Sequence, residues 1–193
     1  MTVYFVRHGE TALNRDSRLQ GQIDCPLNET GIRQAEALRE RLRSQKICFE
    51  RVYSSPLRRA VETARLVSGD ENEIRLDDRL LEIGYGPYEG ALFSDLQGEV
   101  LSFFRDPEHV EAPPGIEPIR ELMARTGAFL REMETLEGPG PFLVVTHGVA
   151  LRAFLGHIQG DGTGAVWGMP IENCRILAVE YAAGKWKLRD AGI

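Results

Sequence analysis

Cysteine is scarce in this chain, and its thiols are far apart. Only Cys25, Cys48 and Cys174 occur among 193 residues, and they form no C-x-x-C pair. An odd and scattered set of three argues against a disulfide framework and against a zinc cluster built on thiolates. We therefore expect reduced thiols and a protein of the cytoplasm.

Long apolar runs and basic tracts are also missing. No stretch approaches the roughly 18 apolar residues of a membrane span, and no signal-like run precedes Arg7. The formal net charge is −6, and no tract of Lys and Arg with interleaved aromatics is present. We therefore expect neither a membrane nor a nucleic acid as partner.

The length and the apolar content are those of one domain. A chain of 193 residues with 42% hydrophobic residues can build a substantial core, and it is short for two domains. No linker, internal repeat or low-complexity segment divides it. We predict a single domain over residues 1–193.

Short apolar segments alternate with amphipathic ones along the chain. This alternation predicts an α/β fold, a three-layer αβα sandwich with a mostly parallel central sheet. Two alternating runs joined by Ala-Ala-Gly predict a hairpin near the C-terminus. The expected strands include residues 2–6, 51–53 and 142–145, and the expected helices include residues 30–45, 56–67 and 117–136.

The first two long helices carry specific signals. In the first, the stripe expected to face the core consists of Ile32, Ala35, Leu38 and Leu42. Before the second, Ser55 is the predicted N-cap, and the following proline suits the first helical position.

Two of the expected strands end in a histidine followed by a glycine. His8 and Gly9 follow the first strand, and His147 and Gly148 follow a later one. Ligands of open α/β sheets bind beyond the carboxyl ends of the strands, so we expect both histidines at one site. Each glycine is expected to let the backbone turn with positive φ and to let a ligand come close.

Two arginines make this site suitable for an anion. Arg7 precedes the first histidine, and Arg59 lies in the first turns of a helix whose N-terminus favours negative charge. Guanidinium groups can contact phosphate oxygens in pairs. Together with the two imidazoles and Asn14, they predict a site for a phosphoryl group.

Five blocks of sequence, taken in order, resemble the signatures of the histidine phosphatase superfamily, also called the phosphoglycerate mutase-like family. The blocks are RHGETALN, RLQGQIDCPLNETG, SSPLRRAVETA, LLEIGYGPYEG and VVTHGVALRA, and the matches run from Val3 to about Ala153. The resemblance implies that His8 attacks phosphorus through Nε2 and forms a phosphohistidine, with Glu82 as the general acid. It further implies a phosphate pocket made of Arg7, Asn14, Arg59 and His147. Gln20 and Gly21 are implied to lie in a loop that contacts the substrate.

These implied roles set requirements on protonation. Neighbouring positive charge disfavours an imidazolium, so Arg7 and Arg59 are expected to keep His8 neutral. A hydrogen bond from its Nδ1–H to a backbone carbonyl is expected to fix the tautomer. Glu82 must instead hold a proton, which a bound phosphate dianion would favour by like-charge repulsion.

The choice of reaction depends on the segment that follows the glutamate motif. A mutase of this family carries a longer covering insertion there. Here a small covering segment, at about residues 83–118, favours hydrolysis. We therefore expect a phosphomonoester hydrolase of the phosphatase branch that acts on a small phosphorylated metabolite.

Several alternatives stay open at this point. The runner-up is a cofactor-dependent phosphoglycerate mutase-like phosphotransferase, and a noncatalytic phospholigand-binding protein is the third hypothesis. Metal-dependent hydrolysis is disfavoured because the sequence has no H-x-x-x-H, and two arginines would repel a cation. We expect no metal and no other cofactor. The sequence leaves open the physiological substrate and whether the protein is a homodimer.

Overall fold

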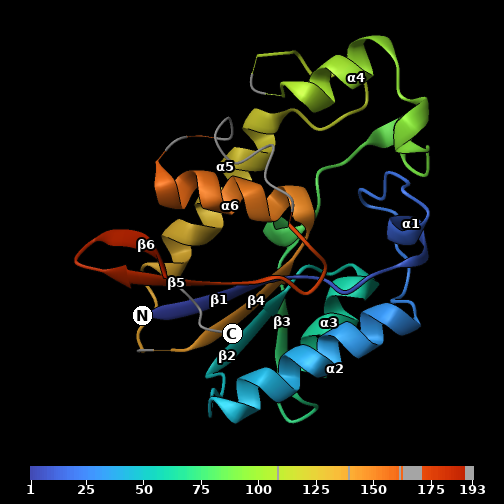
Figure 1. Cartoon of the computed structure of the whole chain (residues 1–193). Coiled ribbons are helices and arrows are strands. Elements are labelled where there is room, and N and C mark those ends of the chain that lie inside the picture. The colour runs from blue at the N-terminus through green and yellow to red at the C-terminus, as the bar shows by residue number, and fades with distance from the viewer. Residues whose placement is uncertain (108, 139, 161, 163–170, 190–193) are drawn as a thin grey trace.

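One mixed sheet forms the centre of the molecule, and helices cover both of its faces (Figure 1). The computed structural model describes residues 1–193 except 108, 139, 161, 163–170 and 190–193. Within these residues the sheet has six strands in the order β3-β2-β4-β1-β5-β6. Their bounds are β1 (Thr2–Arg7), β2 (Arg51–Ser54), β3 (Ile74–Leu76), β4 (Phe142–Thr146), β5 (Ile176–Ala182) and β6 (Lys185–Arg189).

The direction of the strands agrees with the sequence analysis. Neighbouring strands from β3 to β1 run parallel, whereas β5 pairs antiparallel with β1 and forms a hairpin with β6. Parallel neighbours need long crossover connections, which here contain helices. The predicted α/β fold, its mostly parallel sheet and its C-terminal hairpin are confirmed.

Two pairs of long helices complete the three layers (Figure 1). The helices α2 (Glu29–Ser44) and α3 (Arg58–Ser68) cover one face of the sheet, and α5 (Ile119–Met133) and α6 (Gly148–Gln159) cover the other. The shorter elements are α1 (Ala12–Arg15), α4 (Gly98–Arg105) and the 3-10 turns η1 (Asp78–Leu80), η2 (Gly86–Tyr88) and η3 (Phe93–Asp95).

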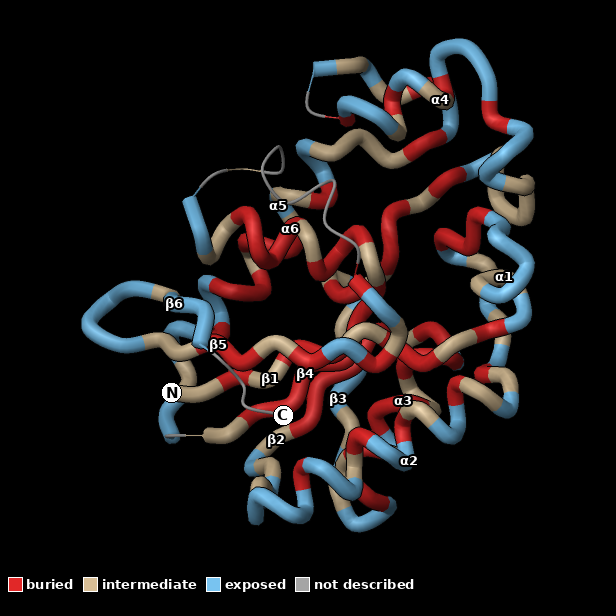
Figure 2. The backbone as a smooth tube through the Cα atoms, viewed as in Figure 1, coloured by how far each residue is buried: buried red, intermediate tan, exposed pale blue. Residues whose placement is uncertain are grey.

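Alternating side chains of the central strands supply a core on each face. Val3 and Phe5 of β1 pack toward α5 and α6, where the rings of Phe5 and Phe154 lie 4.8 Å apart. Val6 faces the opposite way and packs in the cluster that contains Leu38 of α2. This is the two-residue period expected of a strand buried on both faces. Figure 2 shows β4 buried along its whole length.

The buried stripe of α2 differs from the prediction only in its first turn. Ala35, Leu38 and Leu42 are buried as predicted, but Ile32 is 39% exposed and Gly31 takes the inward position. A Cβ on Gly31 would lie only 2.2 Å from the carbonyl oxygen of Glu10, so this inward position admits no side chain. The core-facing position of the first turn is therefore a glycine, and hydrophobicity does not reveal it.

The start of α3 also differs from the prediction. The helix begins at Arg58 with Leu57 as N-cap, so Ser55 is not the cap. The backbone N–H of Ser55 still donates to the carbonyl of Val145 at 3.0 Å, which continues the pairing of β2 with β4 beyond the strand. The first N–H of the helix, on Arg58, donates instead to the carboxylate of Asp24 at 2.6 Å.

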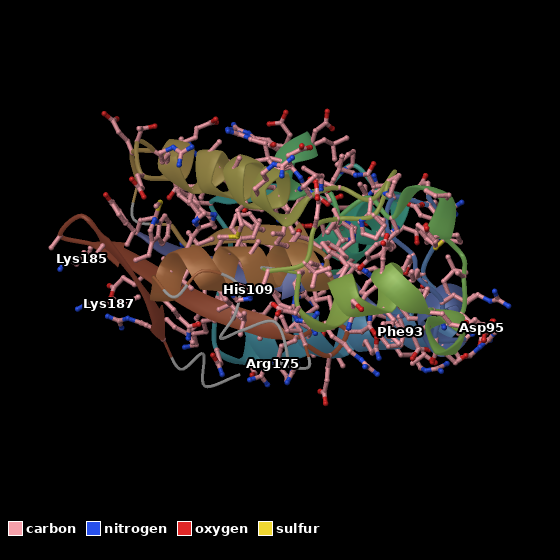
Figure 3. All side chains as sticks on the ribbon, turned by 90° about the horizontal axis from the view of Figure 1, so that it is seen from above. Phe93, Asp95, His109, Arg175, Lys185 and Lys187 are labelled. Carbon is pink, nitrogen blue, oxygen red and sulfur yellow. The ribbon has the colours of Figure 1, made fainter. Side chains whose placement is uncertain are left out.

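Residues 83–118, which we predicted as the covering segment, pack on the first turns of α5 and α6. Ile83 and Phe103 of this segment share a buried cluster with Leu122 of α5 and Ala150 of α6. Its outer surface carries Phe93 and Asp95, which Figure 3 shows near the rim of the molecule. The segment is thus anchored by its own apolar cluster, separate from those on the sheet faces.

The free edge of the hairpin carries exposed cations. Figure 3 shows Lys185 and Lys187 projecting from β6, the last strand in the sheet order. Charged side chains on an edge strand oppose pairing with another chain. None of the described helices combines the length and the apolar character needed to cross a bilayer.

The three cysteines are free thiols in different surroundings. Cys25 is half-buried, Cys48 is exposed and Cys174 is buried. Burial raises the pKa of Cys174 to about 12, so its thiol stays protonated at neutral pH.

The buried stripe of α2 generates a stability prediction. Leu38→Ala should lower the free energy of unfolding by about 2–4 kcal/mol, because it opens a cavity in a fully buried cluster. The matched control Ile32→Ala, on the exposed side of the same helix, should cost less than about 1 kcal/mol. Urea unfolding followed by circular dichroism measures both. Equal losses in the two variants would show that the packing of α2 is wrong.

Candidate functional site

A cleft of about 180 Å³ lies beyond the carboxyl ends of β1 and β4. The two strands are parallel neighbours, and the N–H of His8 donates to the carbonyl of Thr146 at 3.0 Å. This pairing brings the residue after each strand to the same place. Seven of the eight predicted site residues line the cleft, namely Arg7, His8, Asn14, Gln20, Gly21, Arg59 and Glu82.

The glycine after each histidine does not have the conformation that we expected. Neither Gly9 nor Gly148 has a positive φ, so the predicted sharp turn is wrong at both positions. A Cβ on Gly9 would lie 2.6 Å from the carbonyl oxygen of Gly31. Gly9 and Gly31 therefore let the start of α2 pack directly on the loop that carries His8.

His8 is almost completely buried and has one defined tautomer. Its Nδ1 lies 2.7 Å from the carbonyl oxygen of Gly9, and its Nε2 lies 3.3 Å from Nε of Arg59. A carbonyl can only accept a hydrogen bond and a guanidinium can only donate one. Nδ1 therefore carries the proton, and Nε2 carries the lone pair. The expected hydrogen bond from Nδ1 to a backbone carbonyl is present.

Burial and positive charge keep this imidazole neutral. Burial, followed by the charges of Arg59 and Arg7, lowers the pKa of His8 well below the ordinary value of 6.5. The hydrogen bond to Gly9 acts in the opposite direction but is a smaller effect. At neutral pH the Nε2 lone pair is thus available for a reaction.

Arg59 is fully buried, and all three of its nitrogens have partners. Besides Nε on His8, its terminal nitrogens donate to the carbonyls of Gly21 at 2.6 Å and of Ile23 at 2.8 Å. The loop from Leu19 to Ile23 thereby fixes the plane of the guanidinium. Burial lowers the pKa of Arg59, and the charge of Glu82 opposes this shift.

Arg7 has a free donor beside the cleft. One terminal nitrogen donates to the carbonyl of Ile171, but its Nε is buried and has no hydrogen-bond partner among the described residues. Burial lowers the pKa of Arg7, and the nearby charge of Glu82 again opposes the shift. A buried N–H without a partner is costly, so this atom fits an anion in the cleft.

His147 lies directly behind His8 and does not itself line the cleft. The two ring centroids are 5.1 Å apart, and His147 is fully buried. Its Nε2 lies 2.7 Å from the hydroxyl of Ser55, whereas its Nδ1 has no partner within the described part of the chain. Burial, then the charges of Arg59, His8 and Arg7, lowers the pKa of His147 well below 6.5.

Glu82 is buried at the N-terminus of α6. Its Oε1 accepts from the N–H groups of Ile83 and Ala150 at 3.0 Å each, and its Oε2 accepts from Val149 at 3.1 Å. Free N–H groups of a helix start favour a carboxylate. The acidic side chain is therefore held against the cleft by the helix that follows His147.

Asn14 and Gln20 belong to one hydrogen-bond network. Thr11 caps the short helix α1, and its N–H donates to Oδ1 of Asn14 at 3.3 Å. The hydroxyl of Thr11 donates to Oε1 of Gln20 at 3.0 Å, and Nε2 of Gln20 contacts the sulfur of Cys25 at 2.7 Å. The long loop after β1 is thereby ordered along one side of the cleft.

Four residues at or beside the site were not identified as site residues from the sequence. Tyr85 and Arg152 line the cleft. Ser55 contacts His147, and Asn173 contacts the backbone of His8. Arg152 lies four residues after Gly148, which places the two on the same helix face. That spacing was a usable signal. Burial, and then the charge of Glu82, raises the pKa of Tyr85 well above 10, so its hydroxyl stays protonated.

Known proteins resemble this chain along nearly its whole length. The histidine phosphatase superfamily (branch 1) matches residues 3–193. A relative from Yersinia pestis (strain Pestoides F), named probable phosphoglycerate mutase GpmB, is 34% identical over an alignment of 192 positions, which covers 96% of this chain and 87% of the relative.

Solved structures agree in fold over the same length. The alpha-ribazole phosphatase from Shigella flexneri has a TM-score of 0.86 and 26% identity, covering 98% of this chain and 95% of that one. A mycobacterial glucosyl-3-phosphoglycerate phosphatase has a TM-score of 0.85 and 27% identity, covering 97% and 96%. The family match over nearly the whole chain, together with the shared fold, shows that the chain belongs to the histidine phosphatase superfamily.

Proposed function

We propose that this protein is a phosphomonoester hydrolase that acts on a small phosphorylated metabolite through a phosphohistidine on His8. The observation that carries the proposal is the state of that imidazole. Its Nε2 holds a lone pair at the cleft, because Nδ1 donates to Gly9 and Arg59 donates to Nε2. A neutral, oriented imidazole is the form that can attack phosphorus.

In the first step, Nε2 of His8 attacks the phosphorus of the substrate. A P–N bond forms as the P–O bond to the alcohol breaks, and Glu82 gives its proton to the departing alkoxide. The dianionic phosphate favours protonation of this carboxylate by like-charge repulsion. When the substrate binds, the N–H of Arg59 Nε passes from the lone pair of His8 to a nearby phosphoryl oxygen, which frees the lone pair for the attack.

In the second step, water replaces the imidazole. Glu82, now ionised, takes a proton from the attacking water, and the P–N bond breaks. Inorganic phosphate leaves, and the neutral ring regains its lone pair. The proton lost by the acid in the first step is thus recovered in the second, and the enzyme returns to its starting state.

Fixed donors support the charge that develops on the phosphoryl oxygens. We assign this role to Arg7, Arg59, His147 and Asn14, because Nε of Arg7 is a buried donor, and Nδ1 of His147 a buried nitrogen, without partners among the described residues. Positioned donors in a site of low dielectric supply much of the catalysis of phosphoryl transfer. Gln20 and Gly21 are proposed to contact the rest of the substrate. We propose that the reaction needs neither metal nor cofactor.

A phosphoglycerate mutase-like phosphotransfer is the second candidate. The 34% identity to proteins named probable phosphoglycerate mutase favours it. Two similar solved structures carry phosphatase names, and the covering segment with α4 is short, which favours hydrolysis. In a mutase the phosphohistidine returns the phosphoryl group to the substrate before water reaches it.

A panel of phosphorylated metabolites, assayed in EDTA, tests the proposed function. The wild type should release inorganic phosphate, and His8→Ala should lose roughly 10³-fold or more of that activity. His109→Ala, which changes an exposed histidine of the covering segment, is the control and should keep it. Retention of most activity by His8→Ala would refute the nucleophile. Isomerised phosphoglycerate without net phosphate release would favour the second candidate.

The role of Glu82 predicts a dependence on the leaving group. Glu82→Gln should slow the hydrolysis of alkyl phosphates by about 10²–10³-fold, because a poor leaving group needs a proton. The same variant should slow release of p-nitrophenolate, a good leaving group, by less than about 10-fold. The ratio is measured from kcat/KM for the two substrates, which covers the steps up to release of the alcohol and leaves out the later attack by water, where Glu82 acts as the base. Equal losses for both would mean that Glu82 is not the acid.

The lowered pKa of His8 predicts the state of its ring in solution. A histidine with a lowered pKa binds its proton only when the pH falls below the ordinary value, so the ring should be neutral at pH 7 and still neutral at pH 6.5. Ring ¹⁵N spectra, assigned with His8→Ala, should show a protonated Nδ1 and an unprotonated Nε2. A doubly protonated ring at pH 7, or the opposite tautomer, would contradict the assignment.

A further inference from the structure

The segment that leads into β5 crosses the end of β1 beside the nucleophile. The N–H of Cys174 donates to the carbonyl of Arg7 at 3.0 Å, and the side chain of Asn173 donates through Nδ2 to the carbonyl of His8 at 3.0 Å. The backbone at Cys174 has a φ of 55°, in the left-handed region that non-glycine residues seldom adopt. The segment thus makes a tight turn that places an amide at the catalytic loop.

Asn173 has a second contact that reaches into the cleft. The same Nδ2 lies 3.3 Å from Oδ1 of Asn14, and the N–H of Thr11 lies 3.3 Å from that oxygen too. An amide oxygen has two lone pairs, and these two donors use both. The NH₂ group of Asn14, a residue that lines the cleft, is then the part left for a ligand.

The orientation of Asn173 follows from one carbonyl, and that of Asn14 follows from two donors, Asn173 and the N–H of Thr11. Amide oxygen and nitrogen are assigned from the hydrogen bonds that they make. The carbonyl of His8 can only accept, so Asn173 must present its NH₂ to it. That NH₂ can only donate, so Asn14 must present its oxygen to Asn173. A flipped Asn14 would set its NH₂ against two other donors.

We propose that Asn173 is a positioning residue, which fixes the amide of Asn14 so that its NH₂ group faces the phosphoryl group. This inference rests on the proposed function in one respect, namely that the ligand is a phosphoryl group. It holds for hydrolysis and for phosphotransfer alike, because both reactions place that group beside His8. The carbonyl of His8 orients the amide of Asn173, and Asn173 in turn holds the oxygen of Asn14.

A change from donor to acceptor at position 173 should reverse the direction of the hydrogen bond between positions 173 and 14. Asn173→Asp removes the NH₂ and adds a carboxylate, which can only accept. Asn14 should then give its NH₂ to the new carboxylate and turn its oxygen toward the phosphate, because a hydrogen bond to a charged group is stronger than the neutral one from Thr11 that is lost. We expect the affinity for inorganic phosphate to fall by about 10-fold or more, since a donor to a charged group is lost.

A double-mutant cycle with Asn14→Ala separates this effect from the added charge. Repulsion between the new carboxylate and phosphate acts in both backgrounds and cancels in the cycle. Asn173→Asp should therefore weaken phosphate binding much less in the Asn14→Ala background than in the wild type. Asn72→Asp is the matched control, because Asn72 also donates to a carbonyl, that of Ser68 at the far end of α3, and should leave binding unchanged.

Side-chain amide NMR gives a readout that a purely structural role would not produce. The NH₂ signals of Asn14, identified by their loss in Asn14→Ala, should shift when inorganic phosphate is added to the wild type. They should not shift at saturating phosphate in Asn173→Asp. Should that variant not fold, Asn173→Ala removes the donor without charge and should weaken binding about 3-fold, again only when Asn14 is present.

The outcomes distinguish this inference from the proposed function. Binding by the wild type with additive losses in the cycle, or a normal shift of the Asn14 signals in Asn173→Asp, overturns the role of Asn173 alone. Absence of phosphate binding by the wild type overturns the proposed function and this inference with it. A coupled loss together with the missing shift establishes the positioning role.

Discussion

The hydrogen bond from Nε of Arg59 to Nε2 of His8 is the constraint on which the rest of the site depends. It requires an imidazole that is neutral and protonated on Nδ1, and the Gly9 carbonyl holds that proton. Burial and two adjacent cations make protonation of the ring unfavourable. The same cations are oriented for an anion before any substrate arrives, since the loop carbonyls of Gly21 and Ile23 fix the guanidinium plane. In the proposed mechanism, the positive charge that keeps His8 neutral therefore also attracts the phosphoryl group that it attacks.

The sheet supplies the geometry that this constraint needs. Parallel pairing of β1 with β4 sets the residue after each strand side by side, so His8 and His147 become neighbours. The helix that follows β4 then presents its first N–H groups to Glu82, which brings this carboxyl group, the proposed acid, to the same cleft. Close packing of Gly9 on Gly31 holds the loop that carries His8 against α2. Each part is ordinary α/β structure, and the site results from their meeting at one edge.

Much of this arrangement could be predicted from the sequence, and the remainder has a physical reason. The meeting of residues at strand ends was predictable, because parallel strands have their carboxyl ends at the same edge of the sheet for any loop conformation. Asn173 was not, since it lies 165 residues from His8 and no local pattern marks its contact. The glycine after His8 was assigned to a turn, but packing against another backbone selects glycine equally well. Ile32 was predicted to face the core because it is hydrophobic. The inward position of α2 is instead Gly31, which has no apolar side chain to mark it.

The bond between the imidazole and phosphorus is the central claim, and rapid-quench labelling tests it most directly. A substrate with a ³²P-labelled phosphoryl group, mixed with excess enzyme and stopped in alkali within milliseconds, should leave label on the protein. Acid should remove that label, and peptide mapping should place it on Nε2 of His8. Product formation at full rate with no labelled protein, or with the label on another residue, would contradict the account.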